Sequence, residues 1–318
     1  AIVRVRYHNY TCEHDIFVRQ GYAPITINGN AESNNNPAWT SYNVYRFDAN
    51  NAPVYTKSPL EEGSLFRRGN RTAILASNND RSGFTFGVEP TGSFNVLEFG
   101  SATTSQKTWS QLAPSTDDVT NRFKEWSIAG DHERIATIED FYTLESTSIH
   151  SNINKAYGVL YGDGATETQK SVKEAFGYDH NEDPTNSKKG MRGCFVFNVN
   201  NSRNIFFPIG KSGYGRRKGM TSNREKVGTL RYAQRTDYYN NDGTGNIQYV
   251  PLFYDLFERP GAIYQCRNRL ESTNNEVKNS SAFDINYFTM GFEGFENGAS
   301  NNNNGSDSDA CFIRTVKY

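Results

Sequence analysis

The pattern of apolar and polar positions along the chain predicts many short strands and few helices. The clearest buried strand lies within residues 204–215, where Ile205, Phe206 and Phe207 follow one another without alternation between turn formers. Pro208 lacks a backbone donor, so we expect the strand to leave its sheet there. We take this strand as the centre of the fold.

Both ends of the chain carry alternating segments. Residues 1–7 alternate apolar and basic side chains from Val3 on and predict a strand with one buried face. Residues 311–318 predict a second strand, with Arg314 and Lys317 facing water. Because both segments alternate, we expect them to pair in one sheet. Alternatively, residues 1–7 belong to a preceding domain or pair with a neighbouring subunit by strand addition.

Short apolar and aromatic runs bounded by turn formers predict further strands. They lie at residues 16–21, 39–47, 84–88, 94–99, 261–266 and 282–289. The turn at residues 89–92 joins two of them, so we expect a hairpin insertion near residues 78–112.

Two segments have helical patterns. The first helix begins near Thr137, which forms a capping-box pattern with Asp140. Its apolar face comprises Ile138, Phe141, Tyr142 and Leu144. The second helix is predicted at residues 168–176, with Gly177 as its stop. Residues 291–309 are of low complexity and predict a surface loop.

Composition adds an aromatic core to this picture. The chain has 318 residues, enough for one large domain or two ordinary ones, and 14% of them are aromatic. A net charge of -1 gives no bulk attraction to nucleic acid or to an anionic membrane. No apolar run is long enough for a membrane span. No signal peptide is visible, and we expect a mature or trimmed form.

Four cysteines, Cys12, Cys194, Cys266 and Cys311, leave two alternatives open. None forms a Cys-x-x-Cys pair, so no zinc site is predicted. An even number permits two disulfides in an exported protein, with three connectivities. The alternative is four buried thiols, because free cysteine is among the most buried residue types.

Several short sequence segments resemble motifs of one family, the Fibrobacter succinogenes major paralogous domain family. Residues 134–141, within 126–144, resemble its helix entry Leu-Pro-Thr-x-x-Glu-Trp. Later segments are similar to its Phe-Leu-Pro-Ala-Ala-Gly-Tyr-Arg, Gly-x-Tyr-Trp-Ser-Ser and Val-Arg-Cys-Val-Lys-Asp motifs, at residues 205–208 with 213–214, 261–264 and 312–317. The motifs occur in the family's order and cover roughly residues 126–318. Residues 39–43 resemble an earlier element of the family.

The resemblance implies an α+β chain with a C-type-lectin-like fold, in which mixed short-strand sheets, about two helices and long ordered loops form a single domain over residues 1–318. It also implies an exported or surface-attached protein of Bacteroidetes-like bacteria, often associated with fimbriae. Two positions depart from the family. Phe141 replaces the helix tryptophan, and Thr315 replaces the closing cysteine with Cys311 displaced, so these positions depart from the family's disulfide pattern.

Motifs for metal binding and catalysis are incomplete. The calcium tripeptide of C-type lectins is absent. Asp179, Asn181 and Asp183 place oxygens at alternate positions, but Pro184 stands where a calcium loop needs glycine. No Gly-x-Ser-x-Gly or His-Glu-x-x-His motif occurs. We therefore predict no metal, no cofactor and no catalytic residues, and an enzyme is the less favoured hypothesis.

A recognition surface is predicted between residues 232 and 269. Tyrosine combined with asparagine and arginine is typical of binding loops, and aromatic rings also stack on sugars. The predicted ligand-binding residues are Tyr238, Tyr239, Asn240, Asn241, Asp242, Tyr249, Arg267, Asn268 and Arg269. The alternative is that half or more of these tyrosines pack the loops down.

These inferences predict a cell-surface adhesin or ligand-binding module that recognises a glycan or a protein. It would lie outside the cell or on its outer surface, with no nucleic-acid partner and no membrane span. The alternative function is a structural tip or stalk subunit of a fimbria-like assembly.

Overall fold

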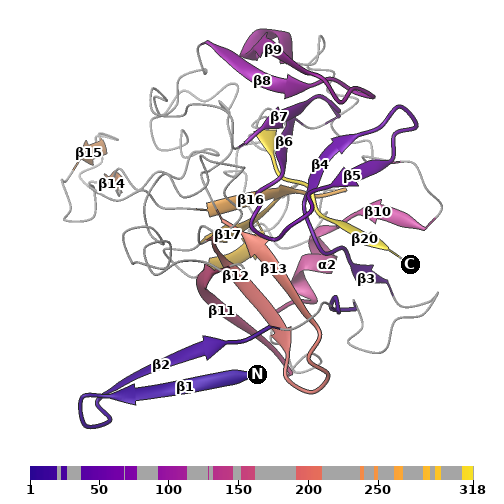
Figure 1. Cartoon of the computed structure of the whole chain (residues 1–318). Helices are drawn as coiled ribbons and strands as arrows, with labels where there is room; N and C mark the ends of the chain where they lie inside the picture. The colour runs from indigo at the N-terminus through magenta and orange to yellow at the C-terminus, as the bar shows by residue number, and fades with distance from the viewer. Residues whose placement is uncertain are drawn as a thin grey trace, which may run out of the picture.

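The part of the chain that the structure describes consists mostly of short antiparallel sheets, with very few helices (Figure 1). The structure is a computed structural model, and it describes residues 1–19, 23–26, 37–67, 69–76, 92–112, 128, 132–145, 152–161, 191–209, 237–239, 247–249, 261–267, 282–286, 291–294 and 310–317. The expectation of short strands in small sheets is therefore confirmed.

The predicted buried strand lies at the edge of a three-stranded sheet. This sheet has the order β11 (Ile153–Leu160), β12 (Met191–Asn198) and β13 (Asn204–Pro208). All five residues of β13 are buried, which confirms the prediction made from its unbroken apolar run. The strand ends at Pro208, as its missing donor predicts.

Three other sheets of the described residues have three or more strands. A five-stranded sheet has the order β19 (Ala310–Cys311), β6 (Ser64–Arg67), β7 (Ala73–Leu75), β8 (Ser93–Leu97) and β9 (Thr104–Thr108). Two three-stranded sheets are β10 (Glu133–Ile135), β20 (Thr315–Lys317), β3 (Ala38–Trp39) and β16 (Gly261–Gln265), β17 (Ala282–Asn286), β18 (Gly291–Gly294).

Within the described ranges, three further sheets have two strands each. They are β1 (Ile2–Tyr7) with β2 (Cys12–Phe17), β4 (Val44–Phe47) with β5 (Pro53–Tyr55), and β14 (Asp237–Tyr239) with β15 (Ile247–Tyr249).

The predicted first helix is α2 (Ile138–Tyr142). Its capping box is formed as expected, because Thr137 Oγ1 accepts from the Asp140 amide at 3.1 Å and Asp140 accepts from the Thr137 amide at 2.8 Å. Arg134 also pairs with the buried Asp140 carboxylate. A short helix, α1 (Trp109–Leu112), was not predicted, and the predicted helix at residues 168–176 lies outside the described residues.

Aromatic rings from distant segments meet around α2. The Phe141 ring lies 4.8 Å from Trp39, 5.7 Å from Tyr264 and 6.0 Å from Phe207, and it stacks on Phe283 at 4.6 Å between centroids. Such pairs add about 0.5–1.5 kcal/mol each beyond the burial of their area. The core is therefore built from aromatic side chains, as composition predicts.

The predicted strand at residues 39–47 is two separate strands, β3 and β4. The chain turns between them, and the carbonyls of Thr40 and Ser41 face the side chain of Arg314. The predicted strand at residues 311–318 is also interrupted, between β19 and β20. Because the strand breaks, its alternation does not hold. Lys317 is exposed as expected, but the prediction that Arg314 faces water is wrong, since Arg314 is fully buried.

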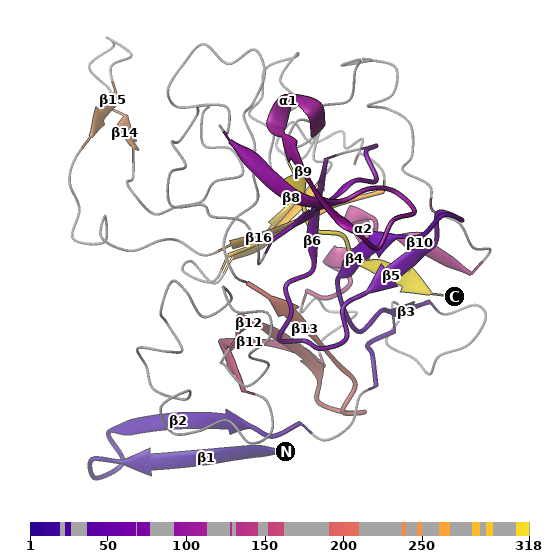
Figure 2. The ribbon, with the colours of Figure 1, turned by 45° about the horizontal axis from the view of Figure 1, so that its top comes forward.

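The two ends of the chain do not share a sheet, so that prediction is also wrong. Strand β1 pairs with β2, whereas β20 pairs with β10 and β3. In both Figure 1 and Figure 2 the indigo β1–β2 pair lies apart from the yellow β20. The predicted buried face of β1 is wrong as well, because all six of its residues are exposed.

The structure also bears on the predicted surface loop at residues 291–309 and on the predicted hairpin near residues 78–112. Residues 291–294 form β18, paired with β17 and with Phe292 buried, so the predicted surface loop is wrong there; residues 295–309 lie outside the described part of the chain. Within residues 78–112, β8 pairs with β7 and β9. The predicted partner strand at residues 84–88 also lies outside the described residues.

Candidate functional site

The strand pair β1–β2 with its turn, residues 1–18, forms an antiparallel ribbon, here called the N-terminal ribbon. Its register is continuous from Ile2 opposite Phe17 to Tyr7 opposite Cys12. Figures 1 and 2 show the ribbon projecting from the body of the molecule. In the part of the chain that the structure describes, neither strand pairs with any other strand.

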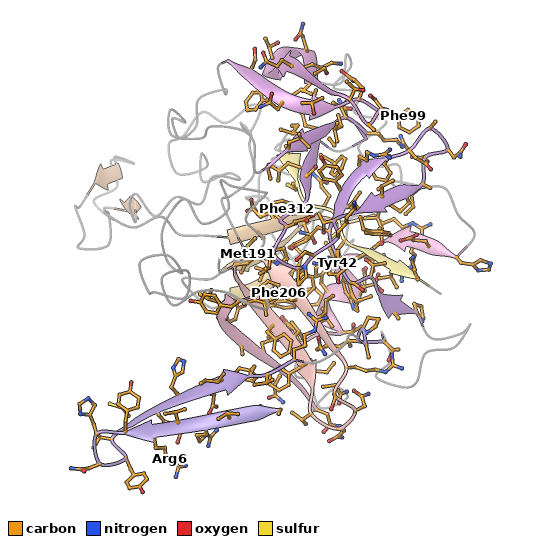
Figure 3. The ribbon with its side chains drawn as sticks, viewed as in Figure 1. Arg6, Tyr42, Phe99, Met191, Phe206 and Phe312 are labelled. Carbon is orange, nitrogen blue, oxygen red and sulfur yellow. The ribbon has the colours of Figure 1, made fainter. Side chains whose placement is uncertain are left out.

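The ribbon is attached to the body through its base. The Phe17 ring lies 5.8 Å from Phe195 and 5.2 Å from Phe197, both on β12. After the ribbon, the chain is held to the start of β13, where Arg203 Nη1 donates to the Pro24 carbonyl at 3.0 Å. Figure 3 shows Arg6 on the ribbon, well apart from Phe206 in the body.

One face of the ribbon is charged. Arg4 donates to Asp15 through two nitrogens at 2.9 and 3.1 Å, and Arg6 Nε donates to Glu13 at 2.7 Å. The hydrogen bond between them raises the pKa of Arg4 and lowers the pKa of Asp15. Exposed pairs of this kind add little stability. Their geometric effect is to match the two strands in one register.

The opposite face of the ribbon is largely apolar and exposed. Side chains alternate between the two faces of a strand, so this face points away from the side on which Phe17 meets β12. Its apolar members remain 41–53% exposed: Val3, Val5, Tyr7, Ile16 and Val18. On the same face, the register sets His14 opposite Val5 and Cys12 opposite Tyr7. The ribbon is thus amphipathic, and no described part of the chain covers its apolar side.

The tip of the ribbon has an uncommon backbone. His8, Asn9 and Tyr10 have positive φ angles of 50°, 52° and 68°. Non-glycine residues rarely adopt this region, and three in succession is a costly turn. Thr11 supports it by donating to the His8 carbonyl from its amide at 3.0 Å and its hydroxyl at 2.6 Å. Tyr10 is 80% exposed at this tip.

The structure brings together only part of the predicted ligand-binding set. Tyr238 and Tyr239 lie on β14 and Tyr249 on β15, and the register sets Asp237 opposite Tyr249 and Tyr239 opposite Ile247. Arg267 follows β16, where its amide donates to the carbonyl of Ala136 at 2.9 Å. The remaining predicted residues lie outside the described part of the chain: Asn240, Asn241, Asp242, Asn268 and Arg269.

Arg314 forms a buried polar centre that sequence reasoning missed. Its guanidinium donates to Asn43 Oδ1 at 2.8 Å and to the Thr40, Ser41 and Phe206 carbonyls at 3.1, 2.8 and 2.9 Å. The group also lies 4.9 Å from the centre of a phenyl ring, that of Phe207. These contacts hold the interrupted strands against β13, so the role of this arginine is structural.

All four cysteines are free thiols in the structure, in agreement with the second of the two alternatives, although Cys12 is only partly buried. Burial raises the pKa of Cys194 to about 12, so this thiol is protonated near neutral pH and is a poor nucleophile. Burial lowers the pKa of Lys155, whose Nζ donates to the Leu144 carbonyl at 3.3 Å and lies over the Phe292 ring.

Neither a metal-ligand cluster nor a membrane helix is found among the described residues. No group of three or more His, Cys, Asp or Glu side chains there is arranged to hold a metal ion. The polar segment at residues 179–183 lies outside them. No helix in the described ranges has the length and apolar character needed to cross a bilayer.

Comparisons with known proteins give no relative for this chain. No family model matches it, and neither a curated protein nor a solved structure matches it.

The charge pattern of residues 1–17 also indicates the ribbon. Residues 12–17 alternate acidic positions, Glu13 and Asp15, that complement Arg4 and Arg6 across a short polar turn. The prediction instead began the second strand at Ile16. Charge complementarity between neighbouring alternating segments would have identified β2 as the partner of β1.

Proposed function

We propose that this chain is a structural subunit of an extracellular or outer-surface assembly and that the N-terminal ribbon joins it to a protein partner. The observation that carries the proposal is the exposed apolar face of the ribbon, formed by residues such as Val3, Val5 and Ile16. Contiguous exposed apolar surface typically marks an interaction site.

The physical argument concerns the stability of the ribbon. An isolated two-stranded hairpin is marginally stable in water. A partner that covers the apolar face would remove that surface from water. Burial of apolar surface contributes a favourable free energy of about 25 cal/mol per Å². The outer edges of β1 and β2, which pair with no other strand among the described residues, also offer backbone groups to a further strand. Docking would therefore stabilise the ribbon and join the subunits in one step.

Photo-crosslinking in the producing cells tests this function. Benzoylphenylalanine replaces Tyr7 on the apolar face or, as a control, Val199, which is 53% exposed on the body. We expect protein adducts from position 7 and severalfold fewer from position 199. Equal yields, or none from position 7, would contradict the proposal.

Ligand binding through the loops around β14 and β15 is the second candidate function. The supporting observation is that the two strands bring Tyr238 and Tyr239 opposite residues 247–248, next to Tyr249. The ligand would be a glycan or a protein at the cell surface. A glycan array with and without calcium tests it, with Tyr239→Ala and Arg269→Ala made singly. Lower binding at an unchanged melting temperature supports the candidate, and unchanged binding contradicts it.

We also propose that the body has the C-type-lectin-like fold implied by the family motifs. The support is the order of the motifs together with small antiparallel sheets and the capped helix α2. An experimental structure compared with members of that fold would test this assignment.

A further inference from the structure

Building on the proposed function of the ribbon, we propose that its partner is a second copy of this chain, joined head to tail. In this arrangement the outer edge of β1 in one copy pairs, antiparallel, with the outer edge of β2 in the next. The N-terminal ribbons then form one continuous sheet across successive copies.

The first argument is the separation of charge between the two strands. Strand β1 carries two positive side chains, Arg4 and Arg6, and no acidic one. Strand β2 carries two negative side chains, Glu13 and Asp15, and no lysine or arginine. The ribbon as a whole is balanced, but its two outer edges have opposite signs.

This separation of charge decides which strands of two copies can pair with each other. Pairing β1 with β1 would set arginines beside arginines, and pairing β2 with β2 would set carboxylates beside carboxylates. Like charges opposite each other in a sheet are destabilising. Pairing β1 with β2 sets each arginine between acidic residues on both sides. Exposed charges contribute little affinity, but they select partner and orientation.

The second argument is that this order makes the apolar faces continuous. Within one ribbon, Val3 lies opposite Ile16 and both are on the apolar face. Adding the next ribbon in the same orientation sets its apolar side chains beside these. Each copy then covers part of the apolar surface of its neighbour, while the charged side chains remain together on the other face.

The third argument is that the edges repel only like-charged strands. Edge strands are commonly blocked by proline, by charged side chains, especially lysine, or by a β-bulge. The ribbon contains neither proline nor lysine, and its six registered pairs include no bulge. Its charged side chains are the arginines of β1 and the carboxylates of β2, which disfavour pairing with an edge of the same sign and not with one of the opposite sign. Both outer edges are unpaired within the described residues. Because a head-to-tail contact does not use the same surface twice, it extends to chains or rings.

The interface is short, so the association is concentration-dependent. Sedimentation of the purified chain is the first test. We expect the average mass to rise with concentration beyond that of a dimer. The triple variant Val3→Thr, Val5→Thr, Ile16→Thr should associate at least about tenfold more weakly. The matched control Val199→Thr, also at an exposed valine, should behave as the wild type.

Charge exchange tests the order of the copies. The variant Arg4→Glu, Arg6→Glu, Glu13→Arg, Asp15→Arg keeps the cross-strand pairs with their signs exchanged, so the ribbon itself is preserved. It should associate with itself. Wild-type chain tagged at its C-terminus, away from the ribbon in Figures 1 and 2, should retain untagged wild type about tenfold better than untagged variant.

Three outcomes would overturn the inference. They are a wild type that is monomeric at every concentration, a threonine variant that associates as well as the wild type, and preferential mixing of wild type with the charge-exchanged variant. Preferential mixing would show that like strands pair. If the purified chain is monomeric while position 7 still crosslinks to another protein in cells, only the choice of partner is wrong and the proposed function stands.

Discussion

Arg314 lies where several segments of the chain meet, and its guanidinium satisfies carbonyl groups of buried and partly buried backbone. Two of these belong to Thr40 and Ser41, and another belongs to Phe206 on β13. A planar guanidinium with five fixed donors suits such a site, whereas an ammonium does not. A single side chain thus joins the turn between β3 and β4 to the sheet formed by β11, β12 and β13.

Replacing Arg314 is expected to destabilise the protein strongly. Arg314→Met leaves buried carbonyls without donors, so the free energy of unfolding should fall by about 3 kcal/mol or more. Arg314→Lys should recover little of this loss, because lysine cannot reach the same acceptors together. Urea denaturation measures both. Lys57→Met, at an exposed lysine away from this centre, is the control and should change stability by less than about 0.5 kcal/mol. Equal losses at the two positions would refute the structural role.

Glu133 makes a contribution to the stability of the folded protein that depends on pH, and its sign follows from the shift of its pKa. Burial raises its pKa above that of a free glutamate, although Thr315 donates a hydrogen bond to its carboxylate at 2.7 Å and Lys317 lies near it. A carboxyl whose pKa is raised by folding binds its proton more tightly in the folded state. Its contribution to stability is therefore present below the unfolded pKa and is lost as pH rises through the folded pKa.

Glu133→Gln should therefore raise the melting temperature at pH 7, and this gain should shrink towards pH 4. Glutamine keeps an acceptor for Thr315 but carries no charge to bury. Thermal unfolding at several pH values measures the effect. Glu139→Gln is the control: Glu139 is exposed in the first turn of α2, where a negative charge is favourable, so its loss should not stabilise at either pH. A gain for Glu133→Gln that is the same at pH 4 and pH 7 would exclude the ionisation as its cause.

At the scale of elements, two glycines in the sheet of β11, β12 and β13 differ in the space around them. One is crowded by neighbouring atoms and the other is not. Gly158 on β11 and Gly193 on β12 lie directly opposite each other. A Cβ atom at Gly193 would lie 2.2 Å from the Phe206 ring and 2.5 Å from the Phe207 carbonyl oxygen. A Cβ atom at Gly158 would have no heavy atom within 4 Å. The absence of a side chain is therefore needed on β12 and not on β11.

Alanine substitutions at these two positions should differ in sign. Gly193→Ala forces the backbone and Phe206 apart and should cost about 1–3 kcal/mol. Gly158→Ala reduces the freedom of the unfolded chain and should be neutral or stabilise by up to about 1 kcal/mol. Chemical denaturation of both variants gives the comparison. A similar cost at both positions would mean that the crowding at Gly193 relaxes without penalty.

Local patterns predicted those elements whose determinants are local. The apolar run of β13 and the capping box of α2 are both complete within a few residues. Alternation failed where a tertiary contact interrupts the strand, as in the segments facing Arg314. The predicted binding residues could not be assembled from sequence, because which strands pair, such as β14 with β15, depends on contacts between distant segments.

At the scale of the whole molecule, the N-terminal ribbon and the body have different sources of stability. The large core cluster begins at Ile25, and no buried hydrophobic residue precedes it among the described residues. Among the described residues, the ribbon contacts the sheet of the body through the rings of Phe17, Phe195 and Phe197. By contrast, the C-terminal segment of residues 310–317 is buried except for its last residue.

Removing residues 1–19 should therefore leave the body folded. The lost aromatic contacts amount to about 0.5–1.5 kcal/mol each, so the melting temperature should fall by only a few degrees, at roughly 2–4 °C per kcal/mol. Calorimetry measures this change. The matched control removes residues 310–318 from the other end, which deletes β19, β20 and the buried Arg314 and should prevent folding. If the N-terminal truncation unfolds the body as the C-terminal one does, the ribbon is part of the core, and its exposed face cannot be treated as a separate docking element.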